Sequence, residues 1–447
     1  MMKQKLIKAI SCLGIHTHDL DDSDEDDNDF EAGTSTSTYG KTYIWSRELN
    51  SHTYGEYSFA VIQANTLLED QSQVEICENG TFVGVYDGHG SDVCSNFVNE
   101  RLFNHFINTV AGTGFINKQV IADAVNAIEG DFEAVVRNNF ETDRLIAASG
   151  SCCLIGVIWQ GRIYIANLGD SRAIIASVNP GTSYIVAQQL STEHNTSIQA
   201  IRNDLWREFT EDPQILIQKN NVWRVKGVIQ VTRAIGDVYL KHPGFQISPE
   251  YEKFQITGNP ITTSVLSSVP TIYTRELNHY DRFLIFASDG LWDYLSNQEA
   301  VDLVHKKPRQ ACILYLSLYV FFFLMPNYIS TSIRLLISNT WGIARRLVHK
   351  AVRRAARRWG IRFTALKDMP EGLRRGFHDD ITVVVVFLDR PRTTPGTPEH
   401  SVKGFSDRGT QSTFNRLAAR LRDGKITNKV SQRAQDQPKS SERNKTG

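Results

Sequence analysis

The chain has 447 residues, in which 49 Lys and Arg balance 49 Asp and Glu, and 41% of the residues are hydrophobic. This composition excludes a wholly disordered chain, a collagen and a multispan membrane protein, and the zero net charge gives no general argument for binding nucleic acid. The six cysteines form no CxxC pair, so we expect neither a disulfide framework nor a zinc site. This cysteine usage favours a reducing compartment.

The N-terminal region is strongly acidic, because residues 19–29 read DLDDSDEDDND. Such a segment cannot bury enough apolar surface to offset the entropy lost on ordering, so we expect a flexible acidic arm over 1–50. Calcium binding is the alternative, but the run lacks the Gly and the terminal Glu of an EF-hand loop. The first residues contain no long apolar segment, which argues against a secretory signal.

Short β-branched runs broken by Gly, Asp and Asn extend from about Tyr54 to Asp389 and predict strands. The polar turns Gln160-Gly161 and Gly169-Asp170 favour antiparallel hairpins over βαβ crossovers. Helical periodicity appears between these runs, so we expect one α+β catalytic domain over 54–389. The predicted strands are Phe59–Ala64, Thr81–Tyr86, Ser151–Trp159, Arg162–Asn167, Arg172–Ser177, Val228–Val231, Arg282–Ala287 and Ile381–Leu388, and the predicted helices are 92–110, 117–140, 298–305 and 343–359.

A hydrophobic insert at 310–341 interrupts this domain. A transmembrane helix would need more length, because the apolar run Ala311–Met325 reaches about 22 Å against a bilayer core of about 30 Å. A folded peripheral helix would expose many aromatic side chains unless a partner covered them. We favour translation of a retained intron, because the residues are those of T- and A-rich codons and the flanking segments join smoothly without the insert.

A basic helix is predicted after the insert, and Arg345–Arg358 surround an apolar stripe with arginines. We expect this helix to pack on the core with a solvated basic face; an acidic partner, a phosphorylated substrate or an anionic lipid surface is the alternative. It lacks the aromatic interleaving of a nucleic-acid-binding module. The tail 390–447 is rich in Thr, Pro, Ser, Lys and Arg, which predicts disorder with one helix around Thr413–Arg422.

Five segments place an Asp at the end of an apolar run. One such Asp is usually a turn former or a helix cap, but five are hard to explain by turns alone. Carboxylates that converge repel one another unless cations neutralise them, and an all-oxygen ligand set favours magnesium or manganese over zinc. Two such ions can activate a hydroxide for in-line displacement at phosphorus, which predicts hydrolysis of a phosphate ester. The segments are FVGVYDGHG (82–90), YIANLGDSR (164–172), VTRAIGD (231–237), FLIFASDGLWD (283–293) and GFHDDITVVVV (376–386).

These motifs, together with the turn Ser149–Ser151, follow the order and spacing of the metal-dependent type 2C serine/threonine protein phosphatases. The chain resembles plant members of that family, especially in VIQANTLLEDQSQVE (61–75) and VWRVKGVIQVTRAIGD (222–237). The resemblance covers 54–389 and implies a four-layer α/β/β/α sandwich of two antiparallel sheets flanked by helices. It also implies a role in signal transduction, through hydrolysis of phosphoserine and phosphothreonine in proteins by a hydroxide that bridges two Mg²⁺ or Mn²⁺ ions.

The resemblance implies a ligand for each metal position. Asp87 would bridge the two ions, and the carbonyl of Gly88 would bind one of them. Asp289 and Asp379 would complete the site, and Glu69 would act directly or through water.

The resemblance also implies that His89 is the general acid that protonates the leaving oxygen, a role that suits a side chain titrating near neutral pH. Asp170 and Asp293 resemble the ligands of a third, weaker ion. Alternation along a strand points Asp379 and Asp380 to opposite sides, and the family pattern places the metal ligand first, so Asp379 is assigned to the metal.

The chain departs from the family in its phosphate-binding residue. Many members have an Arg four residues before the Glu of a Glu-Asp pair. In this chain the pair is Glu69-Asp70, and the residue four positions before Glu69 is Asn65. An amide cannot supply the charge of a guanidinium, so another cation must serve, with Arg47 and Arg233 as candidates. Ser149 and Cys152 are expected to be structural, because no activating base stands beside either in the sequence.

The alternative function is a catalytically impaired phosphatase-fold protein that binds phosphoproteins or a regulator. The presence of every implied metal ligand favours the enzyme. We expect phosphoserine and phosphothreonine proteins as partners, no nucleic acid, no membrane span and a monomer. The resemblance permits the cytoplasm, the nucleus or the inner face of the plasma membrane.

Overall fold

The computed structural model describes residues 44–77, 80–306, 342–389, 401–403 and 406–408. The hydrophobic insert at 310–341 and the helix predicted around Thr413–Arg422 lie outside these residues.

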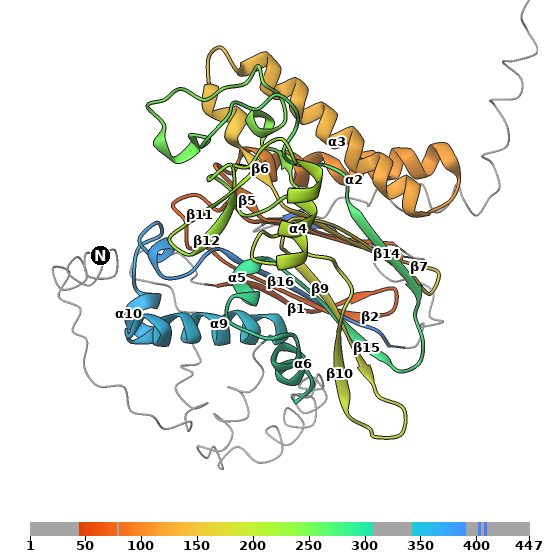
Figure 1. Ribbon diagram of the computed structural model, residues 1–447. Helices are drawn as coiled ribbons and strands as arrows, with labels where there is room; N and C mark the ends of the chain where they lie inside the picture. Colours follow the sequence, from red (N-terminus) through yellow and green to blue (C-terminus); the bar gives the residue numbers. More distant parts are fainter. Residues whose placement is uncertain (1–43, 78–79, 307–341, 390–400, 404–405, 409–447) are drawn as a thin grey trace, which may run out of the picture.

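Two antiparallel sheets form the centre of the described domain (Figure 1). In the described residues one sheet has six strands, in the order β1 (Trp45–His52), β2 (Gly55–Ile62), β16 (Ile381–Phe387), β15 (Asp281–Ala287), β9 (Arg172–Val178) and β10 (Ile185–Gln189). The other has seven, in the order β14 (Thr271–Glu276), β8 (Arg162–Leu168), β7 (Cys153–Trp159), β4 (Gly80–Tyr86), β3 (Gln71–Cys77), β17 (Ser401–Lys403) and β18 (Ser406–Arg408).

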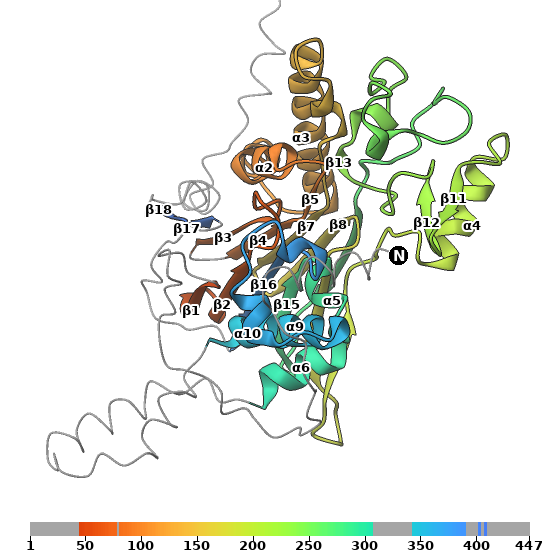
Figure 2. The same ribbon diagram turned by 90° about the vertical axis from the view of Figure 1, so that its left-hand side faces the viewer.

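Helices cover the outer face of each sheet (Figures 1 and 2). Helices α2 (Val93–Thr113) and α3 (Lys118–Asn139) lie over the seven-stranded sheet. Helices α6 (Asn297–His305), α9 (Ile343–Trp359) and α10 (Phe363–Lys367) lie over the six-stranded sheet. The layers therefore run helix, sheet, sheet, helix, which confirms the predicted α+β sandwich. Among the described helices, none has both the length and the apolar character needed to cross a membrane.

The core has three apolar layers: one under α2 and α3, one between the sheets and one under α9. The two sheets approach closely where Gly156 of β7 faces Phe286 of β15, because a Cβ at Gly156 would lie 2.4 Å from the Phe286 ring. Strand β16 is buried along its whole length, which explains its unbroken run of β-branched residues.

Helix α9 packs its apolar stripe against the six-stranded sheet, as the sequence predicts. Its basic face is partly paired, because Arg354 donates to Glu299 of α6 at 2.5 Å and to the carbonyl of Tyr294 at 2.7 Å. The remaining arginines of this face include Arg357, which is exposed to solvent.

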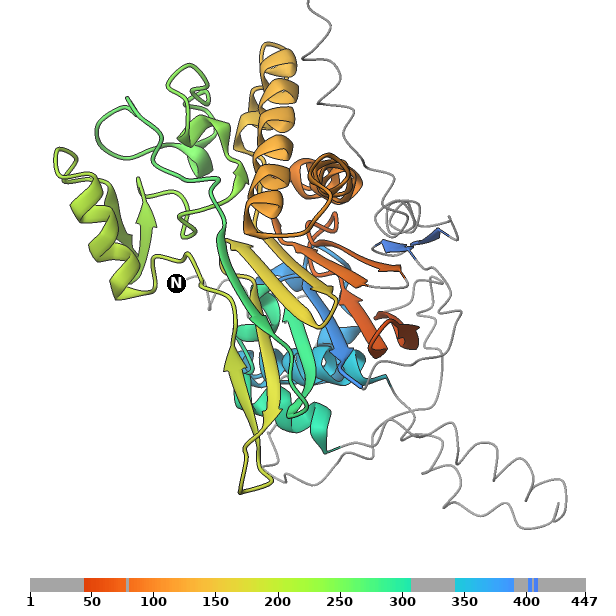
Figure 3. The ribbon, with the colours of Figure 1, turned by 90° about the vertical axis from the view of Figure 1, so that its right-hand side faces the viewer.

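A smaller set of elements projects beside the sandwich (Figure 3). It holds α4 (Gln199–Glu208) and the hairpin of β11 (Leu216–Lys219) and β12 (Val222–Val225). A separate small sheet of β5 (Gly88–His89), β6 (Gly150–Ser151) and β13 (Ile235–Gly236) lies next to the end of β4. Short helical turns complete the described chain at Arg144–Ala148, Val238–Leu240, Glu252–Phe254, Asp289–Trp292 (α5) and Arg374–Gly376.

Two predicted flexible boundaries are wrong. Residues 45–50 of the predicted arm belong to β1, which pairs with β2. Residues 401–403 of the predicted tail form β17, which pairs with β3 and buries Val402. Both are polar or short strands next to low-complexity sequence, so their composition resembles that of a flexible segment even though each completes a sheet.

Two further predictions on the strands are wrong. Gly169-Asp170 does not close a hairpin, because β8 and β9 belong to different sheets. Gly169 has a φ of 92°, a left-handed conformation that lets the chain turn from one sheet into the other. Val228–Val231 makes only isolated bridges, through Ile229 and Val231. The hairpin at Gln160-Gly161 is confirmed.

The histidine on α9 makes the stability of the fold depend on pH. The ring of His349 lies 4.5 Å from the ring of Phe363, and burial, together with Arg353 and Arg345, lowers its pKa to about 3. The unfolded chain takes up a proton here below about pH 6.5 and the folded chain does not, so stability is lost as the pH falls from 6.5 towards 3. We expect His349→Phe to reduce the loss between pH 7 and pH 5 by about 1–2 kcal/mol, measured by urea denaturation. Equal losses in both proteins would contradict this assignment.

Candidate active site

The carboxylates predicted from the five segments lie at one end of the sandwich, where strands from both sheets stop. Asp87 follows β4 and Asp170 follows β8, both in the seven-stranded sheet. Asp289 follows β15 and Asp379 precedes β16, both in the six-stranded sheet. The packing of the two sheets is therefore what brings acids from distant parts of the sequence together.

The charges of neighbouring acids raise the pKa values of Asp87 and Asp289. Burial raises the pKa of Asp87 well above its usual range, and the charges of Asp289, Asp70 and Asp379 raise it further. Burial and the charges of Asp170 and Asp379 do the same for the pKa of Asp289. A divalent cation relieves this mutual repulsion, so the cluster suits a hard metal ion.

The outer members of the cluster show the same effect. Burial, and then the charge of Asp379, raises the pKa of Glu69. Burial, and then the charge of Asp170, raises the pKa of Asp293. All the side chains that the resemblance assigns to metals therefore belong to one electrostatic group.

In the described part of the chain, Asp87, Asp170 and Cys152 form a group of potential ligands whose ligand atoms lie within 4.8 Å of one another. The Cys152 thiol donates to Oδ1 of Asp170 at 3.3 Å. Burial and the charges of Asp170 and Asp87 raise the pKa of this thiol well above its usual range, which disfavours the thiolate form that would bind a metal ion. The donors that remain are carboxylate oxygens, which fit Mg²⁺ or Mn²⁺.

The backbone of Gly88 packs too closely for a side chain. A Cβ there would lie 2.5 Å from the carbonyl oxygen of Glu69 and 2.6 Å from Oγ of Ser95. Instead, the Gly88 amide donates to the Glu69 carbonyl at 3.2 Å, and the Ser95 hydroxyl donates to the same oxygen at 2.6 Å. These contacts hold the Glu69 loop against the residue that follows Asp87.

Asp380 is an anchor for the same loop. Its side chain is 1% exposed, and Oδ1 accepts the amides of Ala64 at 2.6 Å and Asn65 at 3.0 Å. Oδ2 accepts the amide of Glu69 at 2.8 Å. Asp379 is 25% exposed and faces the cluster, an arrangement in keeping with its assignment as the metal ligand of the pair.

Asp70 also belongs to the cluster, and the sequence analysis gave it no role. It is buried, and Ser288 donates to its Oδ2 at 2.7 Å. Burial and the charge of Asp380 raise its pKa well above the usual range. The signal was available in the sequence, because Asp70 directly follows Glu69 and precedes strand β3.

The small sheet brings His89 and Asp237 together, since Nε2 of His89 lies 2.7 Å from Oδ2 of Asp237. Gly150 of the middle strand makes room for this contact, because a Cβ there would lie 2.3 Å from both atoms. Burial lowers the pKa of His89, but the charge and hydrogen bond of Asp237 outweigh it, so the pKa is raised. The sequence marks Asp237 as the end of the segment 231–237 but does not predict this contact.

Ser149 has a structural contact, as the sequence analysis expects. Its Oγ accepts the hydroxyl of Ser91 at 2.8 Å and the amide of Cys94 at 3.0 Å, so it caps the start of α2. Its carbonyl accepts the amide of Asp237 at 3.0 Å, which helps to hold that residue at a φ of 50°.

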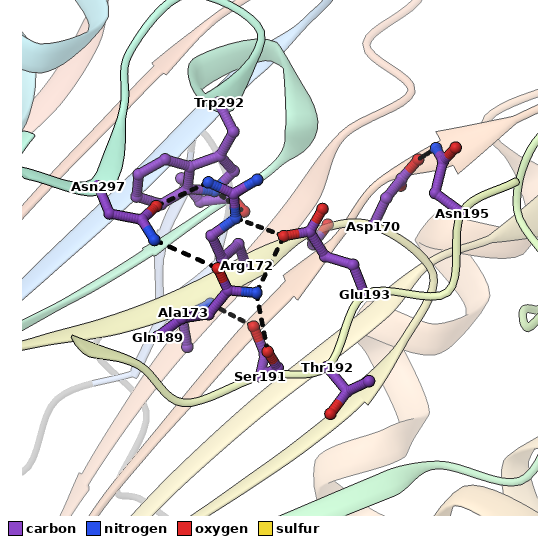
Figure 4. A network of polar contacts seen from close by, with 12 residues as sticks. Asp170, Arg172, Ala173, Gln189, Ser191, Thr192, Glu193, Asn195, Trp292 and Asn297 are labelled. Carbon is purple, nitrogen blue, oxygen red and sulfur yellow. Dashed lines mark hydrogen bonds and ion pairs between the residues drawn. The ribbon is translucent and has the colours of Figure 1, made fainter. Parts of the chain in front are cut away.

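A polar network fixes the corner that carries Asp170 (Figure 4). Asn195 donates to its Oδ2 at 2.6 Å. Two residues later, Arg172 donates to Glu193 and to Asn297, each at 2.6 Å, and lies 5.0 Å from the ring of Trp292. Trp292 and Asn297 follow Asp289 in the chain. The network therefore connects the corner that carries Asp170 with the corner that carries Asp289.

The structure brings neither arginine candidate for phosphate binding into contact with a predicted ligand. Arg47 lies 6.0 Å from the ring of Trp45, and Arg233 donates to the carbonyl of Val269 at 2.6 Å. A different arginine, Arg375, pairs with Asp379 at 2.6 Å. The sequence analysis missed it, although it precedes Asp379 by four residues.

Comparison with known proteins identifies the family. The family model of protein phosphatase 2C matches residues 61–311. Probable protein phosphatase 2C 43 of Oryza sativa is 44% identical over 377 residues, covering 84% of this chain and 89% of that protein. Probable protein phosphatase 2C 46 of Arabidopsis thaliana is 43% identical over 395 residues, covering 86% and 94%. The crystal structure of a serine-threonine phosphatase 2C from Toxoplasma gondii shares the fold, with a TM-score of 0.50, 15% identity, and coverage of 77% of this chain and 99% of that one. The chain therefore belongs to the protein phosphatase 2C family, as its motifs indicate.

Proposed function

We propose that this phosphatase hydrolyses phosphoserine and phosphothreonine in proteins with two Mg²⁺ or Mn²⁺ ions held by the carboxylate cluster. The observation that carries the proposal is the convergence of partly buried acids, with raised pKa values, at the ends of strands from both sheets. When bound, the ions supply an activated hydroxide and neutralise charge on the phosphoryl oxygens. The proposed ligands are Asp87, the Gly88 carbonyl, Glu69, Asp289 and Asp379, with Asp170 and Asp293 for a third ion.

His89 is the proposed general acid for the leaving serine or threonine oxygen. Its side chain is 27% exposed, so a substrate can reach it, and its Nε2 is held by the buried Asp237. Nδ1 is then the nitrogen left to donate a proton. The negative charge of Asp237 keeps the imidazole protonated to higher pH, which suits an acid.

The alternative, a phosphatase fold that only binds phosphoproteins or a regulator, is less well supported. Every residue that the metal chemistry requires is present, and the cluster joins these residues in one electrostatic group. We further propose that the enzyme acts as a monomer in the cytoplasm or nucleus, or at the inner face of the plasma membrane. The buried free thiols Cys94, Cys152 and Cys153 suit a reducing compartment.

Removing one charge from the cluster should make the metal-free protein more stable and the enzyme less active. At pH 8 in chelator, we expect Asp87→Asn to stabilise the protein by about 1–2 kcal/mol, because it relieves repulsion among closely placed, partly buried acids. The same change should abolish the rise in unfolding temperature caused by Mn²⁺ and lower turnover of a phosphothreonine peptide by at least about a hundredfold. Asp123→Asn, which removes an exposed charge from α3, is the matched control and should change neither. A destabilised Asp87→Asn protein that still responds to Mn²⁺ would refute the proposal.

The adjacent aspartates should respond differently to the same change. Asp380→Asn replaces an oxygen that accepts backbone amides, so we expect a loss of about 2–3 kcal/mol in urea denaturation. Asp379→Asn should cost less than about 1 kcal/mol, because its ion pair is half-exposed, yet it should remove the thermal response to Mn²⁺. The reverse pattern would assign the metal to Asp380.

The contact between His89 and Asp237 should matter most for poor leaving groups. A threonine oxygen must be protonated as it leaves, whereas 4-nitrophenolate leaves without a proton. We expect Asp237→Asn to lower kcat on a phosphothreonine peptide by about tenfold and His89→Gln by about a hundredfold, with less than about threefold effect on 4-nitrophenyl phosphate. Asn tolerates the left-handed backbone at this position, so the fold should persist. Equal losses on both substrates would show a structural role instead.

A further inference from the structure

Arg375 contacts an acid of the carboxylate cluster from an exposed position. It lies in the short turn Arg374–Gly376 that leads to β16, and its guanidinium pairs with Oδ2 of Asp379 at 2.6 Å. Its side chain is 50% exposed. The side chain therefore contacts the cluster through its guanidinium and is half exposed to solvent, from which a substrate must come.

The charge of Arg375 acts on the whole cluster and not on Asp379 alone. Burial lowers its pKa, but the charges of Asp379, Glu69 and Asp289 outweigh burial and raise it. In return, its charge lowers the pKa of both Glu69 and Asp293. Arg375 thus lies within electrostatic range of the atoms proposed to bind metal.

The preceding arginine shows a different environment. Arg374 is buried, and its guanidinium lies 3.8 Å from the carboxylate of Glu371, three residues earlier in the chain. Such a side chain supports the turn and is shielded from solvent. Of these two neighbours, Arg375 is the one placed to meet a ligand.

Arg375 also reaches the region from which a family arginine is missing. Asn65 stands where many family members have the phosphate-binding arginine, and its amide lies 3.4 Å from Oδ1 of Asp379. Arg375 contacts the other oxygen of the same carboxylate. A guanidinium from the turn before β16 and a side chain from the loop after β2 therefore converge on one group.

We propose that Arg375 binds the phosphate group of the substrate and takes the place of the arginine absent at Asn65. The inference rests on the proposed function. A guanidinium offers a fork of N–H donors that matches phosphate oxygens, and the half-exposed side chain can turn from Asp379 towards a phosphate. Asp379 keeps the guanidinium at the site between substrates.

The test uses the full-length chain loaded with Mg²⁺ and has two readouts. Calorimetry measures binding of inorganic phosphate, and steady-state kinetics measures KM and kcat on a phosphothreonine peptide. We expect Arg375→Ala to weaken phosphate binding and raise KM by roughly ten- to a hundredfold. Adding Asn65→Arg to this variant should recover most of both losses, because it restores a guanidinium to the same region.

Two controls make the result specific. Arg357→Ala removes an exposed arginine from α9 and should change phosphate binding by less than about twofold. Because Arg375 touches Asp379, Mg²⁺ binding is titrated separately, and we expect Arg375→Ala to leave it unchanged or tighter, since a competing cation is gone.

Either of two outcomes would overturn the inference. One is unchanged phosphate affinity in Arg375→Ala. The other is a loss of phosphate binding that follows weaker Mg²⁺ binding and is not recovered by Asn65→Arg, which would make Arg375 a support for Asp379. A wild-type chain that binds phosphate but shows no Mg²⁺-dependent turnover would instead refute the proposed function, whereas the comparison of phosphate affinity between the wild type and Arg375→Ala tests the role of Arg375 separately.

Discussion

The repulsion among partly buried carboxylates is the constraint on which the rest of this structure depends. Asp87 and Asp289 are held where burial and like charge both disfavour ionisation, so folding must offset that cost elsewhere. The three apolar layers of the sandwich supply the driving force, and backbone amides that surround Asp380 supply a compensating set of hydrogen bonds. The fold thus holds in place a cluster that is unfavourable until a cation enters.

Close backbone approach is the second requirement, and glycines meet it at specific points. Gly88 and Gly150 leave no space for a Cβ, and each lies between residues of the site. Gly150 permits the contact of His89 with Asp237, and Gly169, with its left-handed backbone, turns the chain between the two sheets next to Asp170. The glycines and the charged residues of the site therefore depend on each other, because a side chain at a glycine would displace a charged neighbour.

Most of the strands and carboxylates of the site could be predicted from the sequence. An apolar run that ends in Asp predicts a strand, and it also predicts which end of that strand carries a residue of the site. The contact of Asp237 with His89 could not be predicted, because it depends on pairing between three two-residue strands that carry no periodicity. The false hairpin at Gly169-Asp170 has a related cause, since a polar turn between two strands does not reveal whether they share a sheet. Strand β1 was missed because its polar composition matches that of the adjacent arm.

Arg375 shows why a missing motif residue is weak evidence for a missing function. Phosphate binding depends on where a guanidinium lies in space, and not on the position of that arginine in the sequence. Any segment of the chain that reaches the site can therefore supply the group. Here the loop after β2 and the turn before β16 are adjacent because β2 and β16 pair directly, although more than 300 residues separate Asn65 from Arg375. Strand pairing makes the two positions neighbours, so the loss of charge at one of them does not remove charge from the site.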